Sequence, residues 1–518
     1  MIQRIYTNQI MQTSTKIIFN TIILYVKVVL SLAIALISVP LVLRALGASD
    51  YGLYNLVAGV VAMLAFLNNS MTISSQRFMS VAMGEKNEEK INSIYNTSFL
   101  LHLFLGILVV IAFEIIGFFA IERLNIQSER IWCANVIFQL LILSTFSKIT
   151  AVPFDALINA KEDMLVFSII ELIDSLLMLA VALSITFIPG DRLIFYGMCV
   201  ALISILTFLM KYGWCKKAYN NYSIELIKYK GKFRTKEMLG FTGWNLFGGL
   251  AMIARNQGVA VIINLFLGTI TNAAYGIANQ INGAIGSFSS TFQKAINPQL
   301  MKSEGMNDRN RLIRISYISS KFSVLALALF AIPIILEMDE VLVLWLKEDI
   351  PPFTMRLAQC IIILSIVYQY SVGIMSAIQA TGKIRNYQIT MGTILLTNVP
   401  AAYVILKFGY PVYYTTIAFV ILEIISLLVR LIMASRLTGM KIEEFLKNVI
   451  APTFIIITIP TLIALIPHFI IIKSVIRVII VCSTYGLLYI ILMYRFAFDK
   501  NQRALIISKI NHLVKSKI

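Results

Sequence analysis

Four basic residues interrupt long apolar stretches of this sequence. They are Lys27, Arg77, Arg255 and Lys294, and each is flanked by many aliphatic and aromatic residues. A charged side chain inside a membrane costs roughly 2.5–3.5 kcal/mol on insertion scales, so it needs a partner, a wet cavity or a function. A deep Lys or Arg adds nothing to packing alone, and we therefore expect Lys27 and Arg255 to line a substrate cavity. Arg77 and Lys294 lie nearer a membrane surface, so they could line the cavity or extend their charged ends into the interface.

Three acidic residues form a second group, able to carry protons or cations. Glu171 and Asp174 are spaced i and i+3, which places them on one face of a helix, and Glu423 lies alone in a later apolar stretch. Such carboxylates could bind a coupling proton or sodium ion during transport. They could instead pair with cations such as Lys148 or Arg255, or Glu171 could cap local structure near a helix end.

Small and polar residues recur every three or four positions in several apolar stretches, most regularly between residues 272 and 297. Because lipid leaves hydrogen bonds unmet, a polar stripe on an apolar helix faces protein or water. We interpret the stripe as lining the same cavity, with tight helix packing and hydrogen bonding between helices as the alternative. The residues that we single out are Asn245, Asn256, Asn279, Ser287 and Ser290.

The elements that must position these residues are membrane-spanning helices. The chain has 518 residues, of which 58% are hydrophobic and only 14% charged, which is too apolar for a water-soluble surface. Cutting the sequence into runs of roughly 20 mainly apolar residues predicts an all-α polytopic protein with about fourteen transmembrane helices. The predicted spans are 17–43, 53–82, 93–121, 131–152, 164–188, 193–213, 238–267, 273–297, 315–336, 353–380, 386–406, 412–434, 449–470 and 475–495.

The distribution of charge predicts the orientation of these helices. Alternate loops, together with both termini, carry about four times as many Lys and Arg residues as the remaining loops, which places both termini in the cytoplasm. The formal net charge of +18 is explained by this pattern, so no nucleic-acid partner is expected.

The sequence lacks the marks of an enzyme. Its five Cys residues show no CxxC spacing and its three His residues are dispersed, so neither disulfides nor a metal site are predicted. We find no nucleophile and base pair and no nucleotide-binding motif. The loops on the less basic side are short, whereas a membrane polymerase or ligase of glycans would carry a large external catalytic loop. We therefore expect no enzymatic activity and no cofactor beyond a coupling proton or sodium ion.

Two local patterns recur about 220 residues apart. Leu46-Gly47 precede Asp50-Tyr51-Gly52, as Leu267-Gly268 precede Ala274-Tyr275-Gly276, and the sequence around Ala160 is similar to that around Ala380. They indicate an internal repeat of six helices in the same orientation, the layout of a transporter that alternates access around a cavity between its halves. The predicted organisation is an N-lobe at 1–213, a basic cytoplasmic linker at 214–237, a C-lobe at 238–434, and helices 13 and 14 with a basic cytoplasmic tail at 435–518.

Several segments resemble a known family. The stretches VPLVLRALGASDYGLYNLVAG, SSQRFMSVAMGE, VPFDALINAKEDM, IIELIDSLLML and AIQATGKIRNYQI are similar to those of Wzx-type polysaccharide flippases, which share the MOP superfamily with MATE transporters and lipid II flippases. The resemblance covers essentially the whole chain, and its motifs are helix ends and turns. Only Arg77, within QRF, matches a family pattern among our site residues.

The resemblance implies both a fold and a function. The fold would be two six-helix lobes in a V, with helices 13 and 14 forming a groove for a lipid tail. The function would be flipping of undecaprenyl-diphosphate-linked oligosaccharides across the bacterial cytoplasmic (inner) membrane, for a surface polysaccharide such as lipopolysaccharide O-antigen or capsule. A glycan polymerase and glycosyltransferases would be partners, besides membrane lipid. Lys27 and Arg255 suit the diphosphate, because the ammonium of Lys27 is a compact charge and the planar guanidinium of Arg255 presents paired N–H donors. The polar stripe suits sugars.

Other functions stay open at this point. A MATE-type drug or cation antiporter would have an acidic cavity, whereas cations dominate the first two helices of each half here. A lipid II-type flippase and a lipid scramblase or assembly scaffold without active transport are further alternatives.

Overall fold

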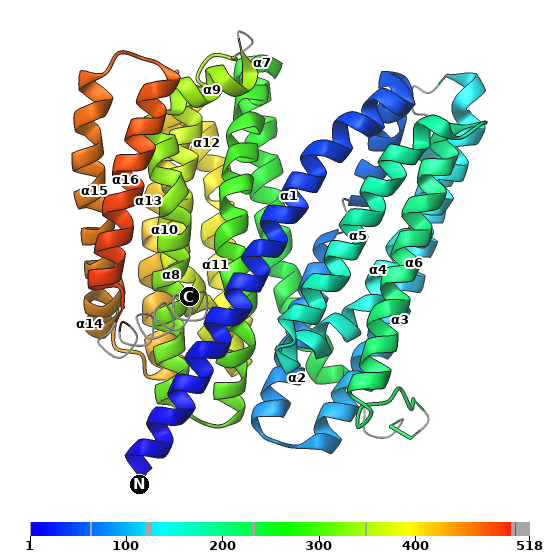
Figure 1. Ribbon diagram of the computed structural model, residues 1–518, viewed down its shortest axis with the longest axis horizontal. Coiled ribbons are helices and arrows are strands. Elements are labelled where there is room, and N and C mark those ends of the chain that lie inside the picture. The colour runs from blue at the N-terminus through cyan, green and yellow to red at the C-terminus, as the bar shows by residue number, and fades with distance from the viewer. Residues whose placement is uncertain are drawn as a thin grey trace, which may run out of the picture. The chain divides into compact units, whose positions relative to one another are not determined.

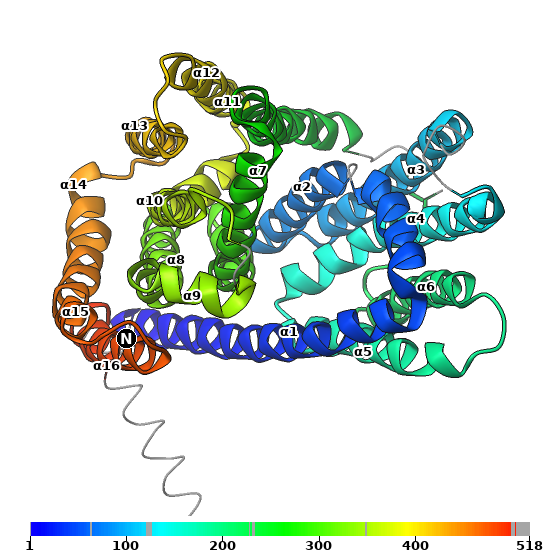
Figure 2. The same cartoon turned by 90° about the horizontal axis from the view of Figure 1, so that it is seen from above.

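A computed structural model shows that the chain is built from helices (Figures 1 and 2), and the part of it that is described contains no strand. The structure describes the backbone of residues 2–62, 65–120, 127–226, 228–229, 234–347, 350–498 and 503. The helices are α1 Ile2–Ala62, α2 Ala65–Gly84, α3 Glu88–Ala120, α4 Ile131–Lys161, α5 Met164–Ser184, α6 Arg192–Ala218, α7 Thr235–Gly305, α8 Arg309–Leu336, α9 Met338–Leu346, α10 Thr354–Thr381, α11 Arg385–Leu396, α12 Asn398–Lys407, α13 Tyr413–Thr438, α14 Ile442–Phe445, α15 Ala451–Ile470 and α16 Val475–Phe496. Short 3₁₀ turns lie at Ser128–Arg130 and Ile185–Phe187, and a π-helical turn at Leu446–Ile450 joins α14 to α15.

Twelve helical segments of the described chain are long and apolar enough to cross a membrane. One of them is α7, whose 71 residues are broken at Gly268 and therefore hold two of the predicted spans. The part of α1 beyond Gly47, together with α2, occupies the place of the predicted span 53–82. The all-α, multi-span fold class is thus confirmed, with fourteen as an approximate count.

Helices α1 and α7 are each broken at a glycine that belongs to the first of the two recurring sequence patterns. Gly47 has φ 79° and ψ 164°, and Gly268 has φ 77° and ψ −177°. A side chain with a Cβ is strained at such positive φ values, so glycine is the residue that lets the helix axis change direction here. The two positions lie 221 residues apart.

The second recurring pattern, around Ala160 and Ala380, also coincides with a repeated backbone feature. Helix α4 ends at Glu162 with φ 66°, and α10 ends at Gly382 with φ 76°. Both are left-handed caps whose N–H groups donate back to carbonyls of the last helical turn. These positions lie 220 residues apart, so the internal repeat is visible in the backbone as well as in the sequence.

The chain divides into two compact units, which we describe separately. Unit 1 comprises Met1–Leu250 and Lys294–Asp308, and unit 2 comprises Ala251–Gln293 and Arg309–Ile518. The predicted linker at 214–237 therefore belongs to unit 1, and α7 contributes its two ends to unit 1 and its middle to unit 2. In each unit we call one end the basic end: it holds the loops after α2, α4, α6 and α7 in unit 1, and after α10 and α13 in unit 2. The opposite end is the far end.

In unit 1, α4 packs against α3 and α6, and α5 packs against α1. The last turn of α7 approaches α2 so closely that two glycines are required at the contact. A Cβ on Gly305 would collide with the carbonyl group of Val81, and one on Gly84 with the carbonyl oxygen of Lys302. Because these are backbone atoms, the end of α7 is fixed against α2.

This contact makes Gly305→Ala destabilising. We expect a loss of about 1–3 kcal/mol in the free energy of unfolding, because the backbone of α2 must move to admit the methyl group. Thermal unfolding of the purified protein in detergent measures the change. Gly213→Ala in α6 is the matched control, since a Cβ there meets nothing within 4 Å and alanine is the better helix former. Equal unfolding temperatures for Gly305→Ala and the unchanged protein would contradict the close contact.

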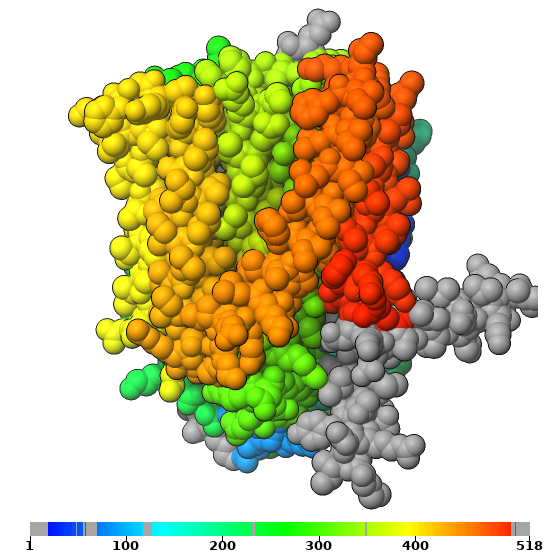
Figure 3. Space-filling view, turned by 90° about the vertical axis from the view of Figure 1, so that its left-hand side faces the viewer, coloured from blue at the N-terminus to red at the C-terminus, as the bar shows by residue number. Residues whose placement is uncertain are grey.

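In unit 2, α10 packs between α8 and α13, and the α15–α16 pair packs against α8. Figure 3 shows α15 in orange and α16 in red at one edge of this unit, with the green surface of its earlier helices between α15 and α13. Two buried tyrosines fasten α16: the hydroxyl of Tyr489 donates to the carbonyl of Leu325 at 2.7 Å, and that of Tyr485 to Ala328 at 3.2 Å.

Two differences from the predicted spans affect charged residues. Helix α4 continues to Lys161, beyond the predicted end at 152, because Pro153 is accommodated inside the helix and packing can satisfy the backbone groups that it frees. Helix α9 lies between the predicted spans 315–336 and 353–380, where the sequence predicts a loop. Most of the predicted basic tail, residues 499–502 and 504–518, lies outside the described residues.

Candidate functional site

The four predicted cavity cations are divided between the units. Lys27 on α1, Arg77 on α2 and Lys294 on α7 belong to unit 1, whereas Arg255, also on α7, belongs to unit 2. Arg255 is half-buried, and its guanidinium donates to Oδ1 of Asn256 at 2.9 and 3.1 Å. Two of the predicted residues, one cation and one amide, therefore act together in unit 2.

In unit 1, Glu171 links two lysines. One carboxylate oxygen of Glu171 lies 3.2 Å from Nζ of Lys27, and the other lies 3.5 Å from Nζ of Lys211. Lys211 also pairs with Asp155 at 2.9 Å. The side chains of Lys27 and Glu171 are 17% and 34% exposed, so this network is only partly buried.

Two more lysines and one more acid extend the network. Lys294 and Lys211 place their ammonium groups 5.7 and 5.8 Å from the ring centre of Phe167, within cation–π range. Asp174 interacts electrostatically with Glu171 and Lys148. We call the set the unit 1 charge cluster: Lys27, Lys148, Lys211, Lys294, Asp155, Glu171 and Asp174. Four cations against three acids leave an excess of positive charge.

The cluster lies inside apolar spans rather than in loops. Its central members lie six to eleven residues from the basic end of their spans: Lys27, Asp155, Glu171, Lys211 and Lys294. At 1.5 Å per residue these distances are roughly 9–16 Å along the helix axes. Charges at that depth in a membrane need partners or water, and the ion pairs supply the partners.

Lys211 and Asp155 were missed by sequence reasoning. Asp155 lies beyond Pro153, where the sequence predicts the end of the span 131–152, so the prediction places Asp155 in a loop. Lys211 lies two residues inside the predicted end of the span 193–213 and resembled the loop cations that follow it. The feature of the sequence that could have predicted a helix through Pro153 is the apolar run that continues on both sides of it.

Arg77 has different surroundings from the cluster. It is 8% exposed, and its guanidinium lies 4.8 and 4.9 Å from the ring centres of Phe78 and Phe241. Such contacts stabilise a guanidinium by roughly 0.5–2 kcal/mol or more, depending on its desolvation. This geometry suits the packing of α2 against the start of α7.

The predicted polar stripe hydrogen-bonds largely within its own helix. The side chains of Asn245 and Asn279 donate to the carbonyls four residues earlier, those of Phe241 and Tyr275. The hydroxyls of Ser287 and Ser290 donate to carbonyls three residues earlier. Asn245 is buried, in line with a packing role, whereas Asn256, Asn279 and Ser290 are exposed and Ser287 is half-buried.

The third predicted coupling acid, Glu423 on α13, is paired away from solvent. It accepts from the guanidinium of Arg430 on the same helix, and the two side chains are 5% and 3% exposed. Arg430 also donates to Oγ of Ser371 on α10 at 3.0 Å. The geometry of this pair suits a structural connection between α10 and α13.

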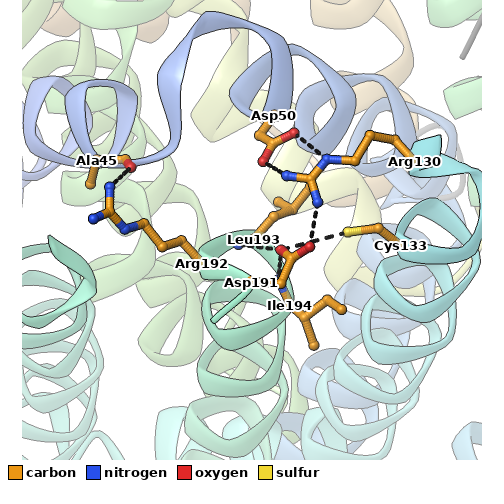
Figure 4. Close-up of polar contacts among 8 residues, drawn as sticks. All are labelled: Ala45, Asp50, Arg130, Cys133, Asp191, Arg192, Leu193 and Ile194. Carbon is orange, nitrogen blue, oxygen red and sulfur yellow. Dashed lines mark hydrogen bonds and ion pairs between the residues drawn. The ribbon is translucent and has the colours of Figure 1, made fainter. Parts of the chain in front are cut away.

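At the far end of unit 1, Arg130 joins three elements (Figure 4). Its Nε donates to Asp50 at 3.0 Å, and its terminal nitrogens pair with Asp50 and Asp191. Asp50 follows the Gly47 break in α1, and Asp191 caps α6 by accepting from the N–H groups of Leu193 and Ile194. Arg130 therefore holds the broken segment of α1 against the starts of α4 and α6.

At the basic end of unit 1, the segment that follows α6 is fastened to α3 and α4. The amides of Asn92 and Asn96 donate to carbonyls of this segment at 2.9 Å, and Lys161 donates to the hydroxyl of Tyr222 at 3.1 Å. Burial, followed by hydrogen bonding to Glu88, raises the pKa of Tyr222 above its ordinary range. The hydroxyl stays protonated as a result. In the described part of the chain, no group of three or more His, Cys, Asp and Glu residues could hold a metal ion.

Comparison with solved structures identifies the fold. The chain superposes on an outward-facing multidrug resistance MATE family transporter of the MOP superfamily with a TM-score of 0.71, at 14% identity, covering 82% of this chain and 96% of that one. A MOP superfamily transporter from Pyrococcus furiosus gives a TM-score of 0.72 at the same identity and coverage. That transporter is described as having a binding pocket of reverse polarity, which suggests a different function for it. Among curated proteins, no sequence matches this chain.

The sequence family follows from a separate comparison. The family model described as "Polysaccharide biosynthesis protein" matches residues 17–304, which is more than half of the chain. This match and the MOP fold confirm the resemblance seen in the quoted motifs, and family and fold are those of multi-pass membrane transporters and flippases rather than enzymes. The chain therefore belongs to the polysaccharide biosynthesis protein family and has the fold of MOP superfamily transporters.

Proposed function

We propose that this protein flips undecaprenyl-diphosphate-linked oligosaccharides from the inner to the outer leaflet of the bacterial cytoplasmic membrane by alternating access, without catalysing a reaction. The observation that carries the proposal is the unit 1 charge cluster, in which four lysines meet three acids inside apolar spans. Membership of a polysaccharide biosynthesis family supports the class of substrate. The source of the glycan would be the glycosyltransferases of the same pathway, and its acceptor a polymerase.

The cluster suits a diphosphate because its lysines are held by carboxylates that a stronger anion can replace. A diphosphate carries two negative charges, and charge-assisted hydrogen bonds from ammonium groups to phosphate are about twice as strong as neutral ones. Glu171 would give up Lys27 to the substrate and keep its second partner, Lys211. The ligand would thus exchange one anion for another instead of leaving bare charges in the membrane.

The proposed orientation places the basic end of each unit, and both termini, in the cytoplasm. The cluster would then lie roughly 9–16 Å from the side on which the glycolipid is assembled. Of the three proposed coupling acids, Glu171 and Asp174 belong to the cluster, whereas Glu423 is closed off by Arg430. The proposal of proton or sodium coupling therefore rests on the first two.

Replacing Lys27 tests the proposal. We expect Lys27→Gln to lower glycan export at least about tenfold, because a lost charge-assisted hydrogen bond is worth roughly 1.5–3 kcal/mol and each 1.4 kcal/mol is a factor of ten. Export is measured as surface polysaccharide in cells that depend on this protein, with its amount in the membrane determined by immunoblot. Lys27→Arg, which keeps the charge, should recover part of the export.

Lys216→Gln is the matched control, because Lys216 is an exposed cation at the basic end of the same unit. It should leave export unchanged. Arg255→Ala separates the two transporter classes: loss of export with normal membrane levels supports the flippase. Unchanged export in Lys27→Gln and Arg255→Ala, together with loss of resistance to cationic drugs, would instead show a MATE-type antiporter and contradict the proposal.

A further inference from the structure

A cavity of about 570 Å³ lies at the far end of unit 2, remote in sequence from the unit 1 charge cluster. The last residues of α8, the short helix α9 and the start of α10 form one side of it. The end of α15, the turn at 471–473 and the start of α16 form the other. The α15–α16 pair that contributes this second side is visible in Figure 3.

The polar side of the cavity holds a balanced set of charges. Glu337, fully buried behind it, accepts from Nε of Arg477 at 2.9 Å and lies 2.8 Å from Nδ1 of His468. Lys473 pairs with Asp339 at 2.5 Å. Burial opposes ionisation of Asp339, but hydrogen bonds from Lys473 and from the backbone of Glu340, together with the charges of Lys473 and Arg477, hold the pKa of this carboxyl below its usual range. Two carboxylates therefore face two permanent cations, with the imidazole beside them.

Two atoms in this set lack hydrogen bonds. Nη2 of Arg477 approaches Glu337 at 2.7 Å as an ion pair but has no hydrogen-bond partner, and neither has Oδ1 of Asp339, 3.6 Å away from it. Arg477 is only 4% exposed. Buried polar groups are nearly always satisfied, so the hydrogen-bonding capacity of this pair is not fully used within the protein. The two atoms lie behind the side chains of Lys473 and Asp339, which are accessible and line the cavity. The α16 terminus beside them has no acid in its first turn, which leaves its partial positive charge available to an anion.

The opposite side of the cavity is apolar and continues onto the outside of the protein. Ile335, Leu336, Met355 and Phe469 line it, and Phe469 and Ile472 are 78% and 87% exposed. In a membrane protein, such a surface at the end of a spanning pair lies against acyl chains. A ligand of this cavity is therefore polar at one end and apolar at the other.

We propose that this cavity binds the headgroup of a phospholipid that carries a primary ammonium, that is, a phosphoethanolamine lipid. Its phosphate would meet Lys473 and Arg477 at the start of α16, its ammonium would donate to Asp339, and its acyl chains would lie along Phe469 and Ile472. The equal numbers of carboxylates and permanent cations favour this zwitterion over a lipid with net negative charge, which would need an excess of cations. The inference is independent of the proposed substrate of unit 1.

Thermal unfolding of the purified protein in detergent, with added lipid, tests this site. Phosphatidylethanolamine should raise the unfolding temperature by on the order of 5 °C more than phosphatidylcholine with the same acyl chains. The methylated ammonium of phosphatidylcholine has no N–H to donate to Asp339. The difference should disappear in Asp339→Asn and in Lys473→Gln. It should persist in Lys407→Gln, which removes an exposed lysine elsewhere in unit 2.

Three results would overturn the proposal. One is equal stabilisation by phosphatidylethanolamine and phosphatidylcholine. A second is equal stabilisation by phosphatidylglycerol, which would show an anion site. The third is full stabilisation by glycerophosphoethanolamine at the same concentration, which would show a site for a soluble phosphate ester rather than a lipid. Lys473 is 67% exposed, so Lys473→Gln should fold normally, and its unfolding temperature without added lipid checks this.

Discussion

Glu423→Ala should destabilise unit 2 by about 3–5 kcal/mol, because it leaves the guanidinium of Arg430 buried without its carboxylate. The two side chains are 5% and 3% exposed, so water cannot replace the lost partner at low cost. The hydroxyl oxygens of Ser371 and Tyr387 would remain as uncharged partners of Arg430. For a unit of this size, the loss corresponds to a fall in the unfolding temperature on the order of 10 °C, measurable by thermal unfolding in detergent.

A double variant separates charge from packing at this position. Glu423→Leu combined with Arg430→Met replaces the pair by apolar groups of similar size, which is often neutral or stabilising compared with a buried ion pair. We expect it to recover most of the unfolding temperature lost in Glu423→Ala. If the double variant also keeps glycan export, Glu423 has a structural role only. A stable Glu423→Ala protein would show that the pair is not closed off from water.

Lys211→Met is the second change with a large expected effect. It removes the cation that joins Asp155 to Glu171, and Asp155 then has no recorded ion-pair partner among the described residues. Breaking a buried pair from one side costs about 3–5 kcal/mol, and protonation of Asp155 recovers part of that loss. Export should fall together with stability, because Glu171 then binds Lys27 without competition from Lys211.

Combining Lys211→Met with Asp155→Asn distinguishes these two effects. The amide needs no counter-ion, so the double variant should regain most of the unfolding temperature. Export should stay low, because Glu171 still binds Lys27 without competition from Lys211, although the three remaining lysines still outnumber the two remaining acids by one. Restored export together with restored stability would mean that Lys211 and Asp155 serve folding alone. An unfolding temperature of Lys211→Met equal to that of the unchanged protein would contradict the ion pairs.

The sequence predicted the helices well because membrane insertion depends on local composition. A run of apolar residues spans the bilayer wherever it occurs in a chain, and most predicted spans therefore match a helix within a few residues. Pro153 misled the prediction because proline ends helices in water, whereas inside a packed bundle its missing hydrogen bond is tolerated. The internal repeat was also readable, since Gly47 and Gly268 are required by the backbone itself.

The partners of the charged residues could not be predicted in the same way. Lys27 and Glu171 are 144 positions apart in sequence, and only the packing of α1 against α5 brings them to 3.2 Å. Sequence reasoning proposed Lys148 or Arg255 as partners of the acids. In the structure Lys148 interacts with Asp174, whereas Glu171 pairs with Lys27 and Lys211. The depth of a charged residue along its helix can be estimated from the local sequence. The direction in which it faces, and the helices that it faces, depend on the packing of the whole protein.

The sequence by itself determined that this chain is a multi-pass helical membrane protein with an internal repeat and motifs of a polysaccharide flippase, because hydropathy, glycine breaks and helix-end motifs act within a few residues of each other. Only the tertiary structure decided which of the deep charges act together. In the structure Lys27 joins a network that includes Lys211 and Asp155. Arg77 lies beside aromatic rings, and Glu423 forms a buried ion pair with Arg430. Ion pairs form between whichever groups the packing of distant helices brings within about 4 Å, and no local pattern encodes that packing.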